Sequence, residues 1–249
     1  MTKTAWAAFK AAREHCREGL DKFGTVQGLK TLQQRLVDRR SGPAYTVQDP
    51  LVYNQALDDL GPAGKIHLIL VGDNPGRREQ ETGRYLVGPS GKIAEGFFRA
   101  APELGIDFRR NVLILNKTPV HTPRTAELRE LCRMGGPDLT ARIAETQRFM
   151  ASLLLEFQRA LSSPAHPLPV WITGYSEMKR GGIFEPYTLA LAELYAGAKP
   201  FLREQVFLYR HFSMNQFSAD LRRQSLEGES VRAALDRIGR SYRRRILGW

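Results

Sequence analysis

The chain has 249 residues, 42% of them hydrophobic, which is enough to form a buried core. No apolar run approaches the roughly 20 residues that span a membrane, and two cysteines, Cys16 and Cys132, are too few for a disulfide framework or a tetrahedral metal site. The net charge of +11 favours polyanionic partners, nucleic acid first, although a basic protein without such a partner has the same composition. We expect a protein of the reducing cytoplasm, monomeric, with no metal and no cofactor.

Residues 1–60 are predicted to be helical, because Leu29, Leu32 and Leu36 share a helical face, and Gly42-Pro43 and Gly61-Pro62 are expected to bracket an irregular link. Four apolar runs follow and are interpreted as buried strands. They cover residues 66–71, 112–115, 170–173 and 206–209. Helical patterns lie between these runs and after the last one. Short strands that alternate with helices predict an α/β fold, a three-layer α/β/α sandwich around a mainly four-stranded parallel sheet. We assign it to residues 61–249, with residues 1–60 as a helical extension packed on the core.

Polar side chains follow three of the four predicted strands. Asp73 and Asn74 follow the first strand, Asn116 ends the second, and His211 follows the fourth. Because the carboxyl ends of parallel strands share one edge of a sheet, we expect these side chains to converge. A carboxylate, two amides and an imidazole at one edge form a plausible reaction site. Each also has a structural interpretation, as a turn residue, a cap or a strand-end histidine.

A second glycine-rich turn, at residues 88–91, opens the helical pattern after the first strand. Backbone N–H groups at the start of a helix bind anions, so this turn is a candidate phosphate site. Such a site also fits an enzyme that acts on a nucleotide or another phosphate-bearing small molecule. The P-loop signature is absent from the sequence, which disfavours a nucleoside triphosphatase.

Taken in chain order, these motifs resemble those of the uracil-DNA glycosylase superfamily. The strand end GDNPG (residues 72–76) is similar to the first motif of its mismatch-specific and single-strand-selective branches. GRYLVGPSG (residues 83–91) resembles a segment of the thermophile-type branch. VLILN (residues 112–116) is similar to the strand whose terminal asparagine reads the uracil edge. His211 and Ser213 match the start of the second catalytic motif.

The resemblance implies a DNA glycosylase that hydrolyses the N-glycosidic bond of uracil, with other deaminated bases as further candidates. Such an enzyme must extrude the base, because the bond is unreachable inside the stack. Asp73, Asn74 and His211 are the implied catalytic residues. Asp73 or Asn74 orients the attacking water, a choice that the sequence leaves open, and His211 stabilises the departing uracil anion.

The resemblance also assigns binding residues. The implied base-binding residues are Asn116, Tyr85, Leu86 and Gly72. The implied DNA-binding residues are Gly88, Ser90, Gly91, Ser213, Met214 and Lys117. Met214 and Phe217 are candidates for an apolar wedge that enters DNA where the base leaves, or for packing under a loop.

The sequence departs from the family pattern at several positions. Leu86 stands where the family has a stacking phenylalanine, and Gly76 stands where some branches have a tyrosine that rejects thymine. Phe212 replaces a proline after His211. Two cysteines cannot hold the iron–sulfur cluster of the thermophile-type branch. His121 falls near a histidine that bonds covalently to the sugar in one branch. The alternative function is therefore a superfamily member that binds nucleic acid or a nucleobase without cleavage.

Overall fold

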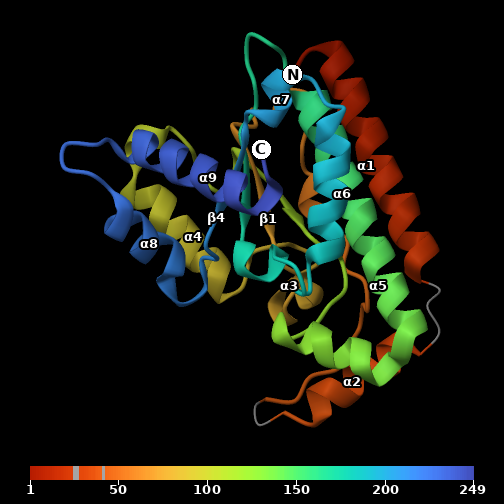
Figure 1. Cartoon of the computed structure of the whole chain (residues 1–249). Helices are drawn as coiled ribbons and strands as arrows, with labels where there is room; N and C mark the ends of the chain where they lie inside the picture. Colours follow the sequence, from red (N-terminus) through yellow and green to blue (C-terminus); the bar gives the residue numbers. More distant parts are fainter. Residues whose placement is uncertain (25–27, 41–42) are drawn as a thin grey trace.

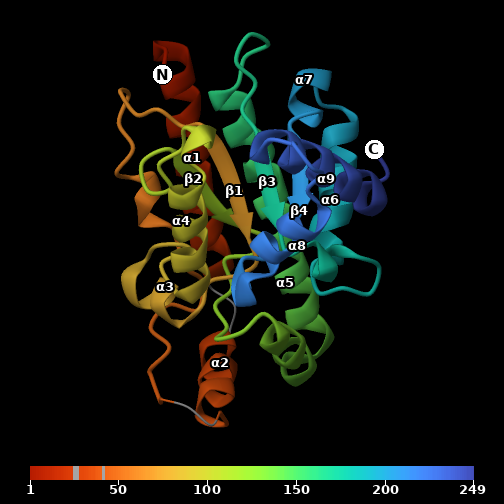
Figure 2. The same ribbon diagram turned by 90° about the vertical axis from the view of Figure 1, so that its left-hand side faces the viewer.

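The computed structural model describes residues 1–24, 28–40 and 43–249. Its middle layer is a parallel sheet with the strand order β2-β1-β3-β4 (Figure 2). The strands are β1 (Leu68–Gly72), β2 (Val112–Asn116), β3 (Val170–Thr173) and β4 (Val206–Tyr209). Every strand residue is buried, which explains why the strands read as continuous apolar runs. The four predicted strands are confirmed, and the first begins two residues later than predicted because residues 66 and 67 precede the ladder.

Helices cover both faces of this sheet, so the predicted three-layer α/β/α sandwich is confirmed (Figure 1). One face carries α1 (Lys3–Gly24), α5 (Ala126–Leu161) and α6 (Glu185–Ala196). The other carries α4 (Pro89–Ala100), α8 (Gln216–Gln224) and α9 (Val231–Leu247). The shorter helices are α2 (Leu29–Asp38), α3 (Arg77–Thr82) and α7 (Pro200–Arg203). No helix in the described residues combines the length and the apolar character that crossing a membrane requires.

The N-terminal stretch contributes both helix and irregular chain. α1 packs along α5, where the rings of Phe9 and Phe157 lie 5.5 Å apart, and Phe9 belongs to the same buried core as the sheet. Residues 25–27 and 41–42 of the predicted extension lie outside the described residues. After α2, residues 43–54 form an irregular segment, which we call the connecting segment, within the irregular link expected between Gly42-Pro43 and Gly61-Pro62. Its backbone groups bond to neighbouring loops, including Val52 N–H to Pro119 O at 2.9 Å.

A break in α5 directs its first part toward the carboxyl edge of the sheet. Gly136 has φ +72° and ψ −167°, values that suit glycine, and Pro137 starts the second part. The helix therefore changes direction there (Figure 1). The consequence is that Thr125 and the first turn of α5 lie beside the ends of the strands, where they help to line a cavity.

Candidate active site

A cavity of about 740 Å³ lies at the carboxyl edge of the sheet. Its wall is formed by residues that follow β1, end β2 or follow β4, and by the first turns of α3, α4, α5 and α8. The predicted site residues that line it are Asp73, Asn74, Leu86, Gly88, Ser90, Asn116, His211, Ser213 and Met214. The polar side chains of three separate strand ends therefore surround one space, whose volume falls in the range of small-molecule binding sites.

Asp73 forms an ion pair with Lys117 at the base of this cavity. Lys117 Nζ lies 2.5 Å from Asp73 Oδ1, and it also donates to the backbone carbonyls of Gly72 and Thr173. The second carboxylate oxygen of Asp73 accepts a hydrogen bond from Thr125 Oγ1 at 3.3 Å. Both oxygens of Asp73 are thus held by the protein.

Lys117 has no exposed surface, so it does not occupy the DNA-contacting position predicted from the sequence. Burial lowers the pKa of its ammonium group, and the carboxylate of Asp73 opposes that shift. Sequence reasoning missed this pairing because Lys117 precedes a polar loop, where a solvated lysine is the ordinary expectation. In the structure, Lys117 contacts the carboxylate of Asp73 from the buried side.

Asn74 is oriented by its amide nitrogen. Asn74 Nδ2 lies 2.9 Å from Thr122 Oγ1 and 3.3 Å from the carbonyl oxygen of Thr122. A carbonyl only accepts, so the NH₂ group must face Thr122 and the amide oxygen must point the other way. That oxygen has no hydrogen-bond partner among the residues described. Asn74 therefore offers the cavity an unused acceptor.

His211 has its tautomer set by the backbone. The N–H of Ser213 donates to His211 Nδ1 at 3.0 Å, so the neutral ring carries its proton on Nε2. Burial lowers the pKa of His211; the charge of Asp73 opposes this shift, and Lys117 adds to it. The ring is therefore neutral at pH 7, and its Nε2–H has no acceptor within the described part of the chain. It is a free donor at the cavity.

Asn116 and Leu86 line the inner wall of the cavity, whereas Gly72, which was predicted to bind the base, lies behind Asn116 and does not line it. The Asn116 side chain is 3% exposed, and its amide bonds to no described residue. Gly72 lies beside it in the ladder, and a Cβ on Gly72 would come 2.5 Å from Asn116 Oδ1. Glycine is therefore required for the amide of Asn116 to keep its place. Leu86, with φ +50°, approaches the same position with its side chain.

Several residues predicted for the site lie elsewhere. Tyr85 is buried, and its hydroxyl donates to Val52 O at 2.5 Å, so Leu86 alone of this pair lines the cavity. Gly91 is buried under the backbone of Leu86, with no room for a Cβ. Phe217 is buried and stacks on Phe212 with ring centroids 4.3 Å apart, which excludes it as an exposed wedge in this structure.

His121 is also buried, and both its ring nitrogens are bonded within the protein. Nδ1 lies 3.0 Å from Pro75 O, and Nε2 lies 2.9 Å from the hydroxyl of Tyr45. It does not line the cavity. One branch of the superfamily has a histidine that bonds to the sugar, and its position suggested that role for His121. In this structure His121 does not face the cavity as that role requires.

Glu79 connects the two glycine-rich turns. Its carboxylate accepts from Gly76 N–H at 3.1 Å and from Gly88 N–H at 3.2 Å. The amide of Gly88 is therefore already used and does not serve the predicted phosphate site, while Ser90 still lines the cavity at the first turn of α4. Sequence reasoning missed Glu79, although a glutamate three residues after a helix N-cap commonly reaches back to its N–H.

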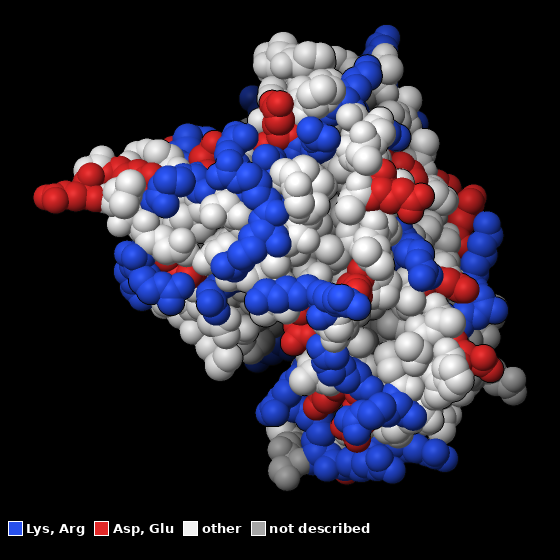
Figure 3. All heavy atoms as spheres, in the orientation of Figure 1, with Lys and Arg blue, Asp and Glu red and all other residues white. Residues whose placement is uncertain are grey.

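The rim of the cavity is basic. Arg78 and Arg124 line it, are exposed, and pair with no carboxylate among the residues described. Lys and Arg gather over the lower part of the molecule in Figure 3 and across the face that carries α9. An indentation separates these two regions of the surface, between α3 and α4, whose first turns line the cavity. Its flanks suit a polyanion.

Met214 projects from this rim. Its side chain is 82% exposed, and Met214 and Asn215 have φ values of +51° and +56°. Two successive non-glycine residues in the left-handed region are uncommon and concentrate at functional sites. The backbone therefore presents an apolar side chain to solvent beside the cavity.

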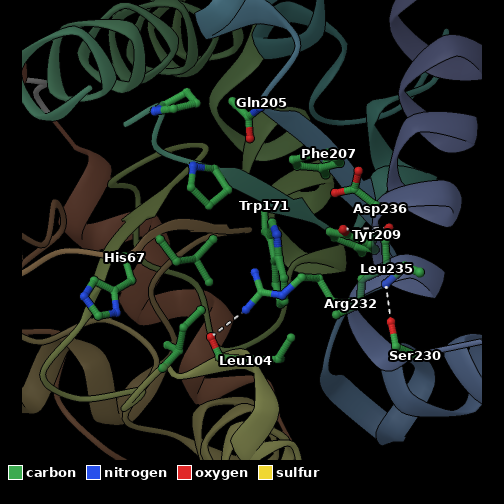
Figure 4. A pocket seen from close by; sticks show the side chains of 15 residues that line it. His67, Leu104, Trp171, Gln205, Phe207, Tyr209, Ser230, Arg232, Leu235 and Asp236 are labelled. Carbon is green, nitrogen blue, oxygen red and sulfur yellow. Dashed lines mark hydrogen bonds between the residues drawn. The ribbon is translucent and has the colours of Figure 1, made fainter. Parts of the chain in front are cut away.

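A second cavity, of about 610 Å³, lies at the amino edge of the sheet between the start of α9 and residues 104–106 (Figure 4). Its floor is aromatic, with Trp171, Phe207 and Tyr209. Arg232 reaches across it to Leu104 O at 3.0 Å, and Asp236 pairs with Arg240. None of the residues predicted to carry chemistry lies in this cavity.

No group of three or more His, Cys, Asp or Glu side chains in residues 1–24, 28–40 and 43–249 is placed to hold a metal ion. At the carboxyl edge, the cavity is lined by the paired carboxylate of Asp73, the amides of Asn74 and Asn116, and the neutral imidazole of His211.

Comparison with known families gives a match to one family model. Residues 59–171 match the family model of the uracil DNA glycosylase superfamily, and the chain carries a domain of that superfamily. Its members act on DNA. Asp73, Asn74 and Asn116 lie inside the matched residues, and His211 lies beyond them. No curated protein matches the chain.

Proposed function

We propose that the protein is a DNA glycosylase that hydrolyses the N-glycosidic bond of uracil after the nucleotide has left the DNA stack, with other deaminated bases as further candidate substrates. One observation carries the proposal. Within the described residues of a superfamily domain, the Asn116 amide, the Asn74 oxygen and the His211 Nε2–H all lack partners and line one cavity.

Asn116 supplies base selectivity in this proposal. Its amide donates to uracil O4 and accepts from N3–H, whereas cytosine presents the opposite pattern of donor and acceptor at these positions. Leu86 forms an apolar wall for the base in place of an aromatic ring. Gly76 stands where some branches of the superfamily have a tyrosine that rejects thymine, so the proposal includes bases larger than uracil among the candidates.

Bond cleavage leaves positive charge on the sugar and negative charge on the departing base. The neutral His211 donates from Nε2 to uracil O2 as the negative charge develops. Asp73, fixed by Lys117, places a carboxylate where it offsets the positive charge of the sugar. The free oxygen of Asn74 accepts a hydrogen bond from the attacking water. The contacts favour Asn74 for this role because both oxygens of Asp73 already have partners.

DNA binding in this proposal uses the rim. Arg78 and Arg124 neutralise phosphates, and Ser90 and Ser213 hydrogen-bond to the backbone of the DNA at the cavity mouth. Met214 enters the space that the extruded base leaves.

The alternative is a superfamily member that binds a base without cleaving the bond. Its support is the same ion pair, because the ammonium group of Lys117 offsets the negative charge that Asp73 presents to the cavity. The two functions share the cavity and differ in whether an abasic site forms.

A single assay separates them. Oligonucleotides with one uracil, single-stranded or paired with guanine, are incubated with the protein and then treated with alkali. Strand breakage at the uracil, lost in Asn74→Ala, supports the glycosylase. Tight binding with no alkali-sensitive site supports the alternative. Absence of both binding and breakage contradicts the two functions together.

A further inference from the structure

The connecting segment and α2 precede residue 59, where the family match begins, yet they contact the loops that hold Asn74. Gln33 Nε2, from α2, donates to His121 O at 2.7 Å and to Pro50 O at 2.9 Å. His121 N–H donates to Pro50 O at 3.0 Å. Leu51 and Val120 form an isolated antiparallel bridge. The loop after β2 is therefore bonded on one side to this N-terminal part of the chain.

On its other side, the same loop is bonded to the turn that follows β1. Thr122 N–H donates to Pro75 O at 3.2 Å, and Thr122 Oγ1 accepts from Asn74 Nδ2. Pro75 is the residue between Asn74 and Gly76. We call residues 74–76 the catalytic turn, so the carbonyl of Pro75 lies within it. A displacement of residues 121–122 would therefore displace the amide of Asn74.

His121 completes this connection in one defined protonation state. Pro75 O can only accept, so Nδ1 of His121 carries the proton, and Nε2 accepts from the hydroxyl of Tyr45. The ring has no exposed surface, and burial lowers its pKa to about 4. Every polar atom of the ring is used, and the hydrogen bonds run continuously from the connecting segment to the catalytic turn.

We propose that Tyr45 and His121 are positioning residues, through which the N-terminal part of the chain holds the Asn74-Pro75-Gly76 turn in its active geometry. This inference rests on the proposed function for its catalytic readout. The chain of contacts is Tyr45 O–H to His121 Nε2, and His121 Nδ1–H to Pro75 O. It assigns a role in the site to a segment that lies outside the matched domain.

Tyr45→Phe is the variant that tests the inference, because it removes only the hydroxyl. The matched control is Tyr53→Phe. Tyr53 is also partly buried, lies under an arginine in the same way (5.1 Å, against 5.0 Å for Tyr45), and donates its hydroxyl to Asp58. We expect the single-turnover rate of uracil excision at saturating enzyme to fall about fivefold in Tyr45→Phe, the effect of one lost hydrogen bond, with DNA affinity unchanged.

Hydrogen exchange gives a readout that does not depend on activity. The amide of Thr122, which donates to Pro75 O, is expected to exchange about fivefold faster in Tyr45→Phe and at the wild-type rate in Tyr53→Phe. Equal rates of exchange and excision in the two variants would overturn the inference.

The tautomer of His121 in the wild-type protein is the third test, and it needs no variant. Nitrogen-15 spectra are expected to show a proton on Nδ1 and none on Nε2, and a proton on Nε2 would overturn the inference. If the wild type excises no uracil while the exchange and tautomer results hold, the proposed function fails and the contact chain stands. If excision is normal but these results fail, only the inference falls.

Discussion

The two cavities lie at opposite edges of the same sheet and have similar volumes, about 740 and 610 Å³, but they differ in how their polar groups are satisfied. At the amino edge, Arg232 and Asp236 bond to protein partners above an aromatic floor. At the carboxyl edge, Asn116, Asn74 and His211 keep donors and acceptors unused among the residues described. Cavity size alone therefore does not identify an active site in this fold.

Backbone conformation separates the two cavities as well. The non-glycine residues with positive φ in the described chain are Leu86, Met214 and Asn215. Leu86 and Met214 line the carboxyl-edge cavity, and Asn215 follows directly. Strained backbone persists where the surrounding structure fixes it, which is typical of functional sites. Unused hydrogen-bonding groups and strain together point to one edge.

The largest expected effect is on excision. Asn74→Ala should lower the single-turnover rate by about a thousandfold, because the water loses its acceptor. Asp236→Asn, at the amino-edge cavity, should change the rate less than about twofold, as expected for a surface change away from the site. Rates would be measured with a uracil-containing oligonucleotide under enzyme excess. Equal losses in both variants would remove the distinction between the two edges.

Removal of the buried ammonium group should have the next largest effect, on stability. Lys117→Met leaves the carboxylate of Asp73 without its ion-pair partner, which costs about 3 kcal/mol in the free energy of unfolding. The control variant Lys92→Met, at an exposed position on α4, should change the free energy of unfolding by less than about 0.5 kcal/mol. Urea unfolding of the three proteins gives these values. A stability loss as small as that of the control would show that the pair is not held as described.

His121 predicts a pH dependence of stability. The unfolded ring binds a proton near pH 6.5, and the folded ring has a pKa of about 4. The unfolded state therefore binds more protons in this window, so stability is full above pH 6.5 and falls as the pH drops toward 4. At pH 4.5 the loss from this group is about 2.5 kcal/mol relative to pH 7.

His121→Gln removes that ring, so its unfolding free energy should fall less than that of the wild type between pH 7 and pH 4.5. Urea unfolding at both values would measure the difference. If the difference in unfolding free energy between the two proteins were the same at pH 7 and pH 4.5, the ring of His121 would not stay neutral in the folded state. The amino-edge cavity has no buried histidine that would produce such an effect, since His67 on its rim is exposed.

The smallest expected effect concerns DNA affinity. Arg78→Ala and Arg124→Ala should each weaken binding several-fold at low salt and reduce the slope of log K against log salt concentration by about 0.9. Arg237→Ala, whose guanidinium is paired with Glu229, should leave the slope nearly unchanged. Fluorescence anisotropy over a salt series measures the slopes. A larger change for Arg237 would place the DNA on the α9 face.

The sheet could be predicted because buried parallel strands appear in the sequence as continuous apolar runs, which are recognised without knowledge of distant contacts. The polar residues that directly follow such strands lie at one edge of the sheet, independently of the conformation of the loops. The hydrogen-bond and ion-pair partners of the site residues could not be predicted from the sequence. Lys117 follows Asn116 directly, and only tertiary packing shows that it turns inward to Asp73. Tyr85 and Leu86 are adjacent, and the positive φ of Leu86 decides which one faces the cavity.

The helices and the irregular link of the N-terminal stretch could be expected from the sequence, but the contacts of that link could not, for a similar reason. α1 and α2 carry helical periodicity, but residues 43–54 take their conformation from bonds to distant loops, such as that from Gln33 to Pro50. His121 was interpreted from a likeness of loop position, although its surroundings come from Tyr45 and Pro75, which are remote in sequence.

The central claim is that a flipped base occupies the carboxyl-edge cavity. Hydrogen exchange with DNA that contains 2′-fluoro-deoxyuridine, in which the fluorine slows cleavage, tests it most directly. We predict that backbone amides in residues 73–76, 116–117 and 211–216 become protected, while those in residues 104–106 and 231–236 do not. Protection confined to the amino edge, or absent from both edges despite DNA binding, would contradict the claim.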